Sequence, residues 1–195
     1  MRLAFHAHLN MWGLNAFVDN MRKTVGRPDA DVLRAAARRG EEEGFVMKLK
    51  GFLGEKGIRY EHFVFKEPCH TVEEAARAVG GRAEDFVKSI CLTDASGVLI
   101  VAVVGGGDRV SRQKVGNAIG TRRPRMATAQ EILERTGYPL GGVPPFGYDA
   151  LFVIDAKVAG REAVYGGGGT ENSLVKVAPA ELQRANGGMI ADITE

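Results

Sequence analysis

Lys88 is the charged residue whose position is most suggestive of chemistry. It lies in a run that predicts a strand, Val87–Thr93, where side-chain alternation puts it on one face with Ile90 and Leu92. A lysine on an apolar face costs free energy unless its ammonium meets a partner or lies at the mouth of a pocket. There, its charge and its donors would suit a carbonyl, a carboxylate or a phosphate. A lysine at the strand end that extends into water fits the pattern equally well.

A second candidate is the segment Gly-Gly-Val-Pro-Pro-Phe-Gly at residues 141–147. Its three glycines and two prolines disfavour both helix and strand and predict a rigid loop. Glycine allows backbone N–H groups to approach a ligand closely, and proline fixes the chain that presents them. The segment, called here the Gly141–Gly147 loop, is a candidate for binding and polarising a carbonyl. A plain turn is the alternative.

Two other glycine runs are candidates for ligand-binding loops. Gly166–Gly169, called here the tetraglycine segment, precedes Thr-Glu-Asn and either lines a pocket or only turns the chain. Gly105–Gly107 follows a predicted buried strand and could hold an anion through backbone N–H groups. No Gly-Lys-Ser/Thr sequence follows this run, so nucleotide hydrolysis is not expected.

Basic residues are concentrated between positions 109 and 125, where no acidic residue occurs. Such a run favours a surface that binds a phosphate backbone, although a solvated face is the more common meaning of clustered charge. The basic cluster consists of Arg109, Arg112, Lys114, Arg122, Arg123 and Arg125.

Several catalytic classes find little support. No Gly-x-Ser-x-Gly elbow is present, and the histidines all precede the predicted central strands: His6, His8, His62 and His70. Cys69 and His70 are adjacent in the chain, and adjacent side chains rarely form a nucleophile–base pair. Two cysteines, Cys69 and Cys91, supply neither a disulfide framework nor a four-ligand zinc site. The sequence therefore predicts no metal and no cofactor.

Composition indicates a globular protein with a core of its own. The chain has 195 residues, of which 45% are hydrophobic and 26% charged, and its net charge is +2. No apolar run approaches the ~18 residues that a membrane helix needs. The N-terminus lacks the compact apolar block of a signal peptide. With so few cysteines, a reducing, cytoplasmic setting is expected.

The chain is predicted to consist of an N-terminal extension, 1–46, and a compact domain, 47–195. Pro28 can open a helix through the alanines at 35–37, which is expected to end at Glu41–Glu43. The alternative to an extension is a genuine accessory helix pair.

Within the compact domain, helices and short strands alternate without a strict βαβ rhythm. Helices are predicted at 46–57, 71–80, 111–119, 128–137 and 179–185, with capping boxes beginning at Thr71 and Thr128. Strands are predicted at 58–65, 87–93, 98–104, 151–155, 162–165, 174–177 and 189–193. The strand at 98–104 is apolar on both faces and should be central. The prediction is a mixed α/β (α+β-like) fold, a curved mixed β-sheet surrounded by short helices.

These residues together resemble the YbaK family, which includes free-standing relatives of the editing domain inserted in bacterial prolyl-tRNA synthetases. The resemblance covers about residues 47–193. It rests most on Thr136-Gly137-Tyr138 leading into the Gly141–Gly147 loop. The other matching segments are His70–Ala76, Val87–Ser89, Arg125–Ala127 and Glu131.

The resemblance implies hydrolysis of the ester that joins an amino acid to tRNA, without a metal or a protein nucleophile. It implies that Lys88 contacts the substrate and that Gly141, Gly142 and Gly147 hold the aminoacyl group near the reacting water. The substrate-binding residues expected with them are Thr71, Ser89, Pro144, Phe146, Gly167, Asn172 and Ser173. The basic cluster would bind the acceptor stem. An aminoacyl-tRNA synthetase is a further possible partner, and neither DNA nor a membrane is expected.

One departure from the family concerns specificity. Synthetase-inserted alanine editors carry a histidine in the late strand-loop region, where this chain has Gly166–Asn172 and no histidine after His70. Asn172 or Ser173 could supply a polar contact instead, and the edited amino acid stays open. A catalytically silent module that binds tRNA or a synthetase is the alternative function. A small-molecule ester or nucleotide hydrolase is a third.

Overall fold

The computed structural model of this chain describes residues 30–66 and 71–195. The chain divides into two compact units, Met1–Glu41 and Glu42–Glu195, and both β-sheets belong to the second. Most of the predicted extension, together with Cys69 and His70, lies outside the described residues.

A five-stranded mixed sheet forms the centre of the second unit. Its strand order is β4-β2-β3-β5-β8. The central strand, β3 (Leu99–Gly105), pairs antiparallel with β2 (Val87–Thr93) and parallel with β5 (Leu151–Asp155). The edge strands are β4 (Arg125–Met126) and β8 (Met189–Ala191). All residues of β3 are buried, which confirms the prediction of a central strand.

A second, antiparallel sheet has the order β1-β7-β6. Its strands are β1 (Tyr60–Val64), β7 (Ser173–Val177) and β6 (Val164–Gly167). An isolated parallel bridge between Phe86 and Tyr165 links it to the first sheet. The predicted mixed α/β class is confirmed, but the strands form two sheets where the sequence predicted one. Local periodicity identifies strands and their faces, whereas the choice of pairing partner depends on residues far apart in the chain.

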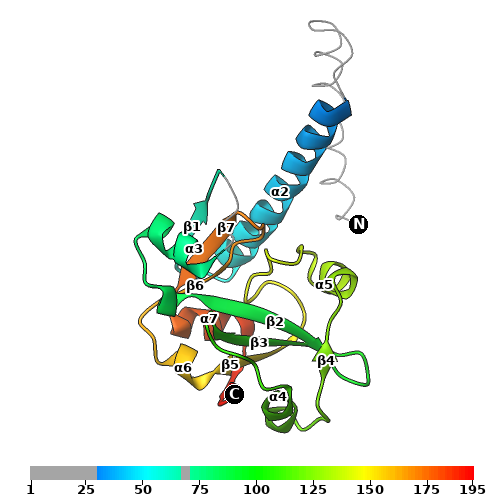
Figure 1. The fold of residues 1–195 in the computed structure, drawn as a ribbon, viewed down its shortest axis with the longest axis vertical. Helices are drawn as coiled ribbons and strands as arrows, with labels where there is room; N and C mark the ends of the chain where they lie inside the picture. Colours follow the sequence, from blue (N-terminus) through cyan, green and yellow to red (C-terminus); the bar gives the residue numbers. More distant parts are fainter. Residues whose placement is uncertain (1–29, 67–70) are drawn as a thin grey trace, which may run out of the picture. The chain divides into compact units, whose positions relative to one another are not determined.

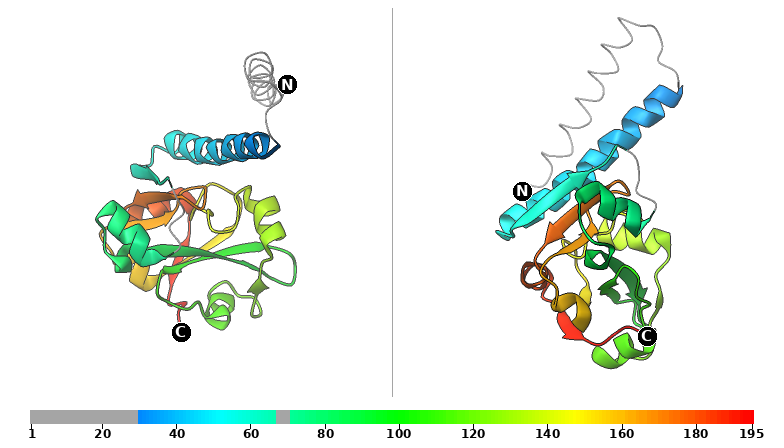
Figure 2. Two further views of the ribbon diagram at one scale, coloured as in Figure 1. Left: turned by 45° about the horizontal axis from the view of Figure 1, so that its top comes forward. Right: turned by 60° about the vertical axis from the view of Figure 1, so that its left-hand side comes forward.

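Helices cover both sheets (Figures 1 and 2). They are the part of α2 (Ala30–Glu55) that follows Glu41, α3 (Val72–Val79), α4 (Arg112–Ala118), α5 (Ala129–Thr136), α6 (Ala156–Ala159), α7 (Pro179–Asn186) and a short 3-10 helix, η1 (Ala83–Asp85). Thr71 caps α3 by accepting from the Glu74 N–H at 3.1 Å. Thr128 and Glu131 form the predicted capping box of α5. Figure 1 and the left view of Figure 2 place α3 and α5 near opposite ends of β2.

The predicted helix end at Glu41–Glu43 is wrong, because α2 continues to Glu55. An unfavourable helix dipole is worth only about 0.3–1 kcal/mol, and glutamate is a good helix former. Leu49 and Leu53 from the same helix are fully buried in the core. Burial of these two leucine side chains stabilises the helix by more free energy than the unfavourable dipole interaction costs.

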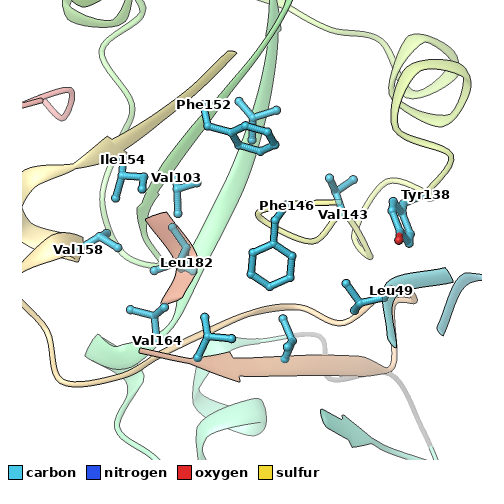
Figure 3. Packing of buried hydrophobic residues seen from close by; sticks show 14 of the residues in the cluster. Leu49, Val103, Tyr138, Val143, Phe146, Phe152, Ile154, Val158, Val164 and Leu182 are labelled. Atoms are coloured by element: carbon cyan, nitrogen blue, oxygen red, sulfur yellow. The ribbon is translucent and has the colours of Figure 1, made fainter. Parts of the chain in front are cut away.

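The main core lies where the two sheets and the Gly141–Gly147 loop meet. Figure 3 shows Phe146 pointing from that loop into a cluster that also contains Val103, Val164 and Leu182. Val115 of α4 and Ile193 pack on the other side of the five-stranded sheet, in a second cluster. In the described part of the chain, no helix is both long and apolar enough to cross a membrane.

Candidate active site

A pocket of about 560 Å³ lies along β2, with walls from α3, β4, α5 and two glycine-rich segments. Most of its lining is apolar, as in Val72, Ile90, Met126 and Val143. The predicted site residues that line it are Thr71, Lys88, Ser89, Gly141, Gly167 and Ser173. The lysine that the sequence singled out therefore opens into a cavity shared with the first glycine of the Gly141–Gly147 loop.

Lys88 is exposed, and within the described residues no carboxylate pairs with its ammonium. Of the residues that share its face, Leu92 belongs to the second buried cluster and the partly buried Ile90 packs against that cluster. The ammonium is thus available to a molecule that enters the pocket.

Ser89 lies on the opposite face of β2, with its hydroxyl oxygen buried and without a hydrogen-bond partner among the described residues. The backbone N–H and carbonyl groups of Ser89 also face an unpaired strand edge, as the neighbouring strand contacts indicate. The Ala127 N–H donates to the Cys91 carbonyl at 3.0 Å, so Cys91 presents its backbone away from β3. Alternate residues of a strand present backbone groups to the same side, and Ser89 therefore faces the same edge. The two-residue β4 pairs only with Leu92 and Thr93. The strand edge at Ser89 is left open to the pocket.

Each glycine named in the Gly141–Gly147 loop has a structural reason. Gly141 and Gly147 have φ of 91° and 95°, which only glycine adopts readily. A Cβ on Gly142 would lie 2.7 Å from the Thr170 Cα, so this backbone packs directly against the tetraglycine side of the site.

The loop is held from several sides. The Tyr148 hydroxyl donates to the Pro144 carbonyl at 2.7 Å, and the Asn186 amide donates to the Pro145 carbonyl at 2.9 Å. Phe146 is fully buried and stacks on Phe52 of α2 with ring centroids 6.2 Å apart. Four predicted site residues of the loop do not line the pocket: Gly142, Pro144, Phe146 and Gly147. They support the conformation of the residues that do.

The tetraglycine segment packs backbone to backbone against that loop. A Cβ on Gly167 would lie 2.5 Å from the Val143 carbonyl oxygen. The Gly169 N–H donates to the Gly142 carbonyl at 2.9 Å, and Gly169 has a φ of 107°. Larger residues at Gly166 and Gly167 would separate the two segments, whereas a Cβ on Gly168 would lie 2.5 Å from the Leu174 N atom of β7.

Asn172 and Ser173 are engaged in structural hydrogen bonds. The Asn172 side-chain amide donates to the Phe65 carbonyl at 2.9 Å, and the Phe65 N–H donates to the Asn172 carbonyl at 2.8 Å. The Thr170 hydroxyl lies 2.7 Å from the Ser173 hydroxyl. Ser173 lines the pocket and Asn172 does not. Asn172 thus fixes the segment to the end of β1.

Comparison with known proteins identifies the family. A model of the aminoacyl-tRNA editing domain matches residues 66–185. This chain belongs to that family. The resemblance seen in the sequence is confirmed, and the chain is homologous to the editing domain of prolyl-tRNA synthetases.

Relatives of this editing domain occur alone and within synthetases. It is 30% identical over 120 residues to the uncharacterized protein YwhH of Bacillus subtilis (strain 168), covering 60% of this chain and 76% of that protein. It is 31% identical over 126 residues to a proline–tRNA ligase of Trichlorobacter lovleyi, covering 65% of this chain but only 21% of the ligase. A crystal structure described as a proposed trans-editing enzyme for prolyl-tRNA synthetase matches with a TM-score of 0.72 and 30% identity, covering 77% of this chain and 97% of that chain.

Two side chains that were not predicted as site residues, His62 and Lys48, contact the segments around the pocket of the editing domain. The Nε2 atom of His62 lies 2.9 Å from the Gly168 carbonyl oxygen. Burial lowers the pKa of His62, aided by the charge of Lys50 and opposed by the bond to Gly168, so a neutral ring that donates from Nε2 fits the site. The Lys48 ammonium donates to the Thr136 carbonyl at 2.8 Å and lies 4.5 Å from the Tyr138 ring centroid. Both contacts connect residues too distant in the chain for a local pattern to indicate.

Phe45 also contacts this region, with its ring centroid 6.2 Å from that of Tyr138. Phe45 precedes the domain boundary predicted from the sequence, and that boundary stays a prediction. Further residues that line the pocket were not among the candidate site residues of the sequence, and they include Glu171, Leu140 and Met126.

The Cys91 thiol lines the pocket of the editing domain but is poorly suited to nucleophilic attack. It is 3% exposed, and burial raises its pKa to about 11. At neutral pH almost no thiolate is present, and the thiolate is the nucleophile. Among the described residues, no group of three histidine, cysteine or acidic side chains is placed to hold a metal ion.

The basic cluster lies outside the pocket, and its members differ in availability. The Lys114 ammonium pairs with Asp192 at 2.8 Å, and Arg125 forms a two-point pair with Glu131 at 2.6 and 2.9 Å. This pairing lowers the pKa of Glu131 to about 2. Arg112 reaches the Pro124 carbonyl at 3.5 Å. Arg109, Arg122 and Arg123 are exposed and have no side-chain partner in the described part of the chain.

Proposed function

We propose that this editing domain hydrolyses, in trans, the ester bond of mischarged aminoacyl-tRNA. The observation that carries the proposal is one pocket lined together by Lys88, Ser89 and Gly141, at the open edge of β2. Support for action in trans comes from the solved relative described as a proposed trans-editing enzyme, whose length this chain matches almost completely. The cytoplasm, where aminoacyl-tRNA occurs, is the proposed setting.

An ester is already activated, so positioning and charge stabilisation can supply the catalysis. Water attacks the carbonyl carbon, the bond to the ribose oxygen breaks, and that oxygen takes up a proton. The carbonyl oxygen gains negative charge in the transition state. In this proposal the Lys88 ammonium and the donors of Ser89 stabilise that charge.

The remaining predicted residues divide into two roles in the proposal. Gly141, Gly167, Thr71 and Ser173 form walls that hold the aminoacyl group against β2. The others fix the shape of those walls: Gly142, Pro144, Phe146, Gly147 and Asn172.

The basic cluster is proposed to bind the acceptor stem. The exposed residues Arg109, Arg122 and Arg123 would contribute most, because Lys114 and Arg125 already neutralise carboxylates of the domain.

The decisive experiment measures amino-acid release from cysteinyl-, alanyl- and seryl-tRNA. We expect the wild-type protein to hydrolyse at least one of them and Lys88→Ala to lose at least about a hundredfold in rate, as expected when a group that stabilises the transition-state charge is removed. Thermal unfolding should be unchanged, because Lys88 is exposed. Lys56→Ala, an exposed lysine outside the pocket, is the matched control.

A silent binding module would bind these tRNAs and release no amino acid. Full activity of Lys88→Ala would exclude the role assigned to Lys88. Hydrolysis that needs no tRNA would favour a small-molecule esterase.

A further inference from the structure

Glu171 brings a negative charge to the wall that faces β2. In the described part of the chain, the pocket is lined by two charged side chains, Lys88 and Glu171. They come from separate segments, Lys88 from β2 and Glu171 from the connection between β6 and β7. A Cβ built on Gly141 would lie 3.2 Å from the Glu171 Cγ, so Glu171 lies against the first glycine of the Gly141–Gly147 loop.

The carboxylate of Glu171 is available, whereas its neighbours are fixed. Glu171 is exposed and makes no hydrogen bond or ion pair with any described residue. Thr170 is bonded to Ser173 at 2.7 Å, and Asn172 is bonded to Phe65 at 2.9 Å. A charged group held on an ordered backbone, beside a cavity and without an internal partner, suits a cationic part of a ligand.

The proposed substrate has such a part. An aminoacyl ester carries a protonated α-amino group on the carbon that bears the ester carbonyl. A pocket that polarises the carbonyl must therefore also hold the ammonium nearby. The Lys88 charge repels an ammonium, and the Glu171 carboxylate attracts it.

We infer that Glu171 binds the α-ammonium group of the aminoacyl ester and thereby selects free aminoacyl esters over N-acylated ones. This inference rests on the proposed function. It assigns to the segment that lacks the late histidine a charge-based role in substrate binding.

Binding of a non-hydrolysable analogue tests the inference without requiring catalysis. The probes are 3′-alanylamino-3′-deoxyadenosine, in which an amide replaces the ester, and its N-acetyl derivative, which lacks the positive charge. We expect calorimetry to show about fivefold tighter binding of the charged probe to the wild-type protein, an effect typical of a solvent-accessible ion pair. Glu171→Gln should bind both probes equally, and Glu171→Asp should restore part of the preference.

Glu162→Gln is the matched control, because Glu162 is an exposed carboxylate outside this pocket. Equal affinity of the wild-type protein for both probes, or no measurable binding of the charged probe, would overturn the inference. So would an equal loss of affinity for both probes in Glu171→Gln.

Hydrolysis separates this result from a failure of the proposed function. The same variants are assayed with alanyl-tRNA and N-acetyl-alanyl-tRNA, and with the cysteinyl and seryl pairs. Charge-dependent binding without hydrolysis of any aminoacyl-tRNA would keep the inference and reject the deacylase. Hydrolysis of an aminoacyl-tRNA without a preference for the charged probe would support the deacylase and reject the role of Glu171.

Discussion

Three pocket-lining residues of β2, Lys88, Ser89 and Cys91, differ in chemistry because of their surroundings. Lys88 is exposed and unpaired within the described residues, and the Ser89 hydroxyl is buried without a partner. The Cys91 thiol, on the same face as Ser89, is buried with a raised pKa. Burial stabilises the neutral thiol of Cys91, whereas the Lys88 side chain is exposed. At the residue scale, the site therefore suits charge stabilisation better than thiol attack.

The raised pKa of Cys91 predicts slow alkylation. In a Cys69→Ser background, iodoacetamide at pH 7 should modify Cys91 about two orders of magnitude more slowly than in the unfolded protein, because the thiolate is scarce. The rate should rise with pH until about 11, the pKa of the buried thiol. Mass spectrometry at several pH values measures this rate.

Cys91→Ala should retain hydrolysis of aminoacyl-tRNA, since the proposed reaction uses no thiolate. Rapid alkylation of the folded protein at neutral pH, or loss of hydrolysis in this variant without unfolding, would contradict the neutral, non-nucleophilic assignment.

At the scale of elements, the site depends on two glycine-rich segments that touch through their backbones. The Gly169 N–H donates to the Gly142 carbonyl, and Gly167 lies against the Val143 carbonyl. The sequence predicted both segments as loops from glycine and proline content. It could not predict their contact, since close backbone approach between separate segments follows from the fold. The contact explains Gly166 and Gly167 as packing requirements.

Gly167→Ala tests that packing. The added methyl group would lie 2.5 Å from the Val143 oxygen, so one segment must move. We expect a loss of about 1–3 kcal/mol in the free energy of unfolding, the usual cost of overpacking, and reduced hydrolysis. Urea unfolding and the hydrolysis assay measure the two effects.

Gly107→Ala provides the control, because a Cβ at this exposed turn meets no atom within 4 Å. Its stability should change by less than about 0.5 kcal/mol. Equal stability of Gly167→Ala and the wild-type protein would show that the two segments tolerate separation.

For the molecule as a whole, charge distribution matters more than the net charge of +2. The basic cluster is a single run in the sequence, but in the structure some of its members pair with acids while others remain exposed. Asp192 reaches Lys114 from the C-terminal end of the chain. A basic side chain that is already paired with a carboxylate contributes less to phosphate binding than an unpaired one.

The double variant Arg122→Ala/Arg123→Ala should weaken tRNA binding and reduce its salt dependence. Each lost phosphate contact lowers the slope of log affinity against log salt by about 0.9. Filter binding at several salt concentrations measures the slope. Lys114→Ala should change the slope less, because its ammonium is already paired at 2.8 Å. Identical slopes in the double variant and the wild-type protein would place the tRNA contact elsewhere.

Local sequence determined the features that depend on neighbouring residues. The continuous apolar run at 98–104 identified β3 as central, the cap residues Thr71 and Thr128 located two helix starts, and alternation placed Lys88 on its face. Motif order indicated the family. The helix end expected at Glu41–Glu43 was wrong because burial of more distant residues outweighed a weak local signal.

Tertiary structure alone decided which segments meet. It divided the strands between two sheets, brought His62 to Gly168 and Lys48 to Thr136, and placed Glu171 in the pocket of Lys88. These contacts join residues that are far apart in the chain, and neither periodicity nor capping carries information about such pairs. The side chains suited to the chemistry are evident in the sequence, whereas their convergence depends on packing of the whole domain.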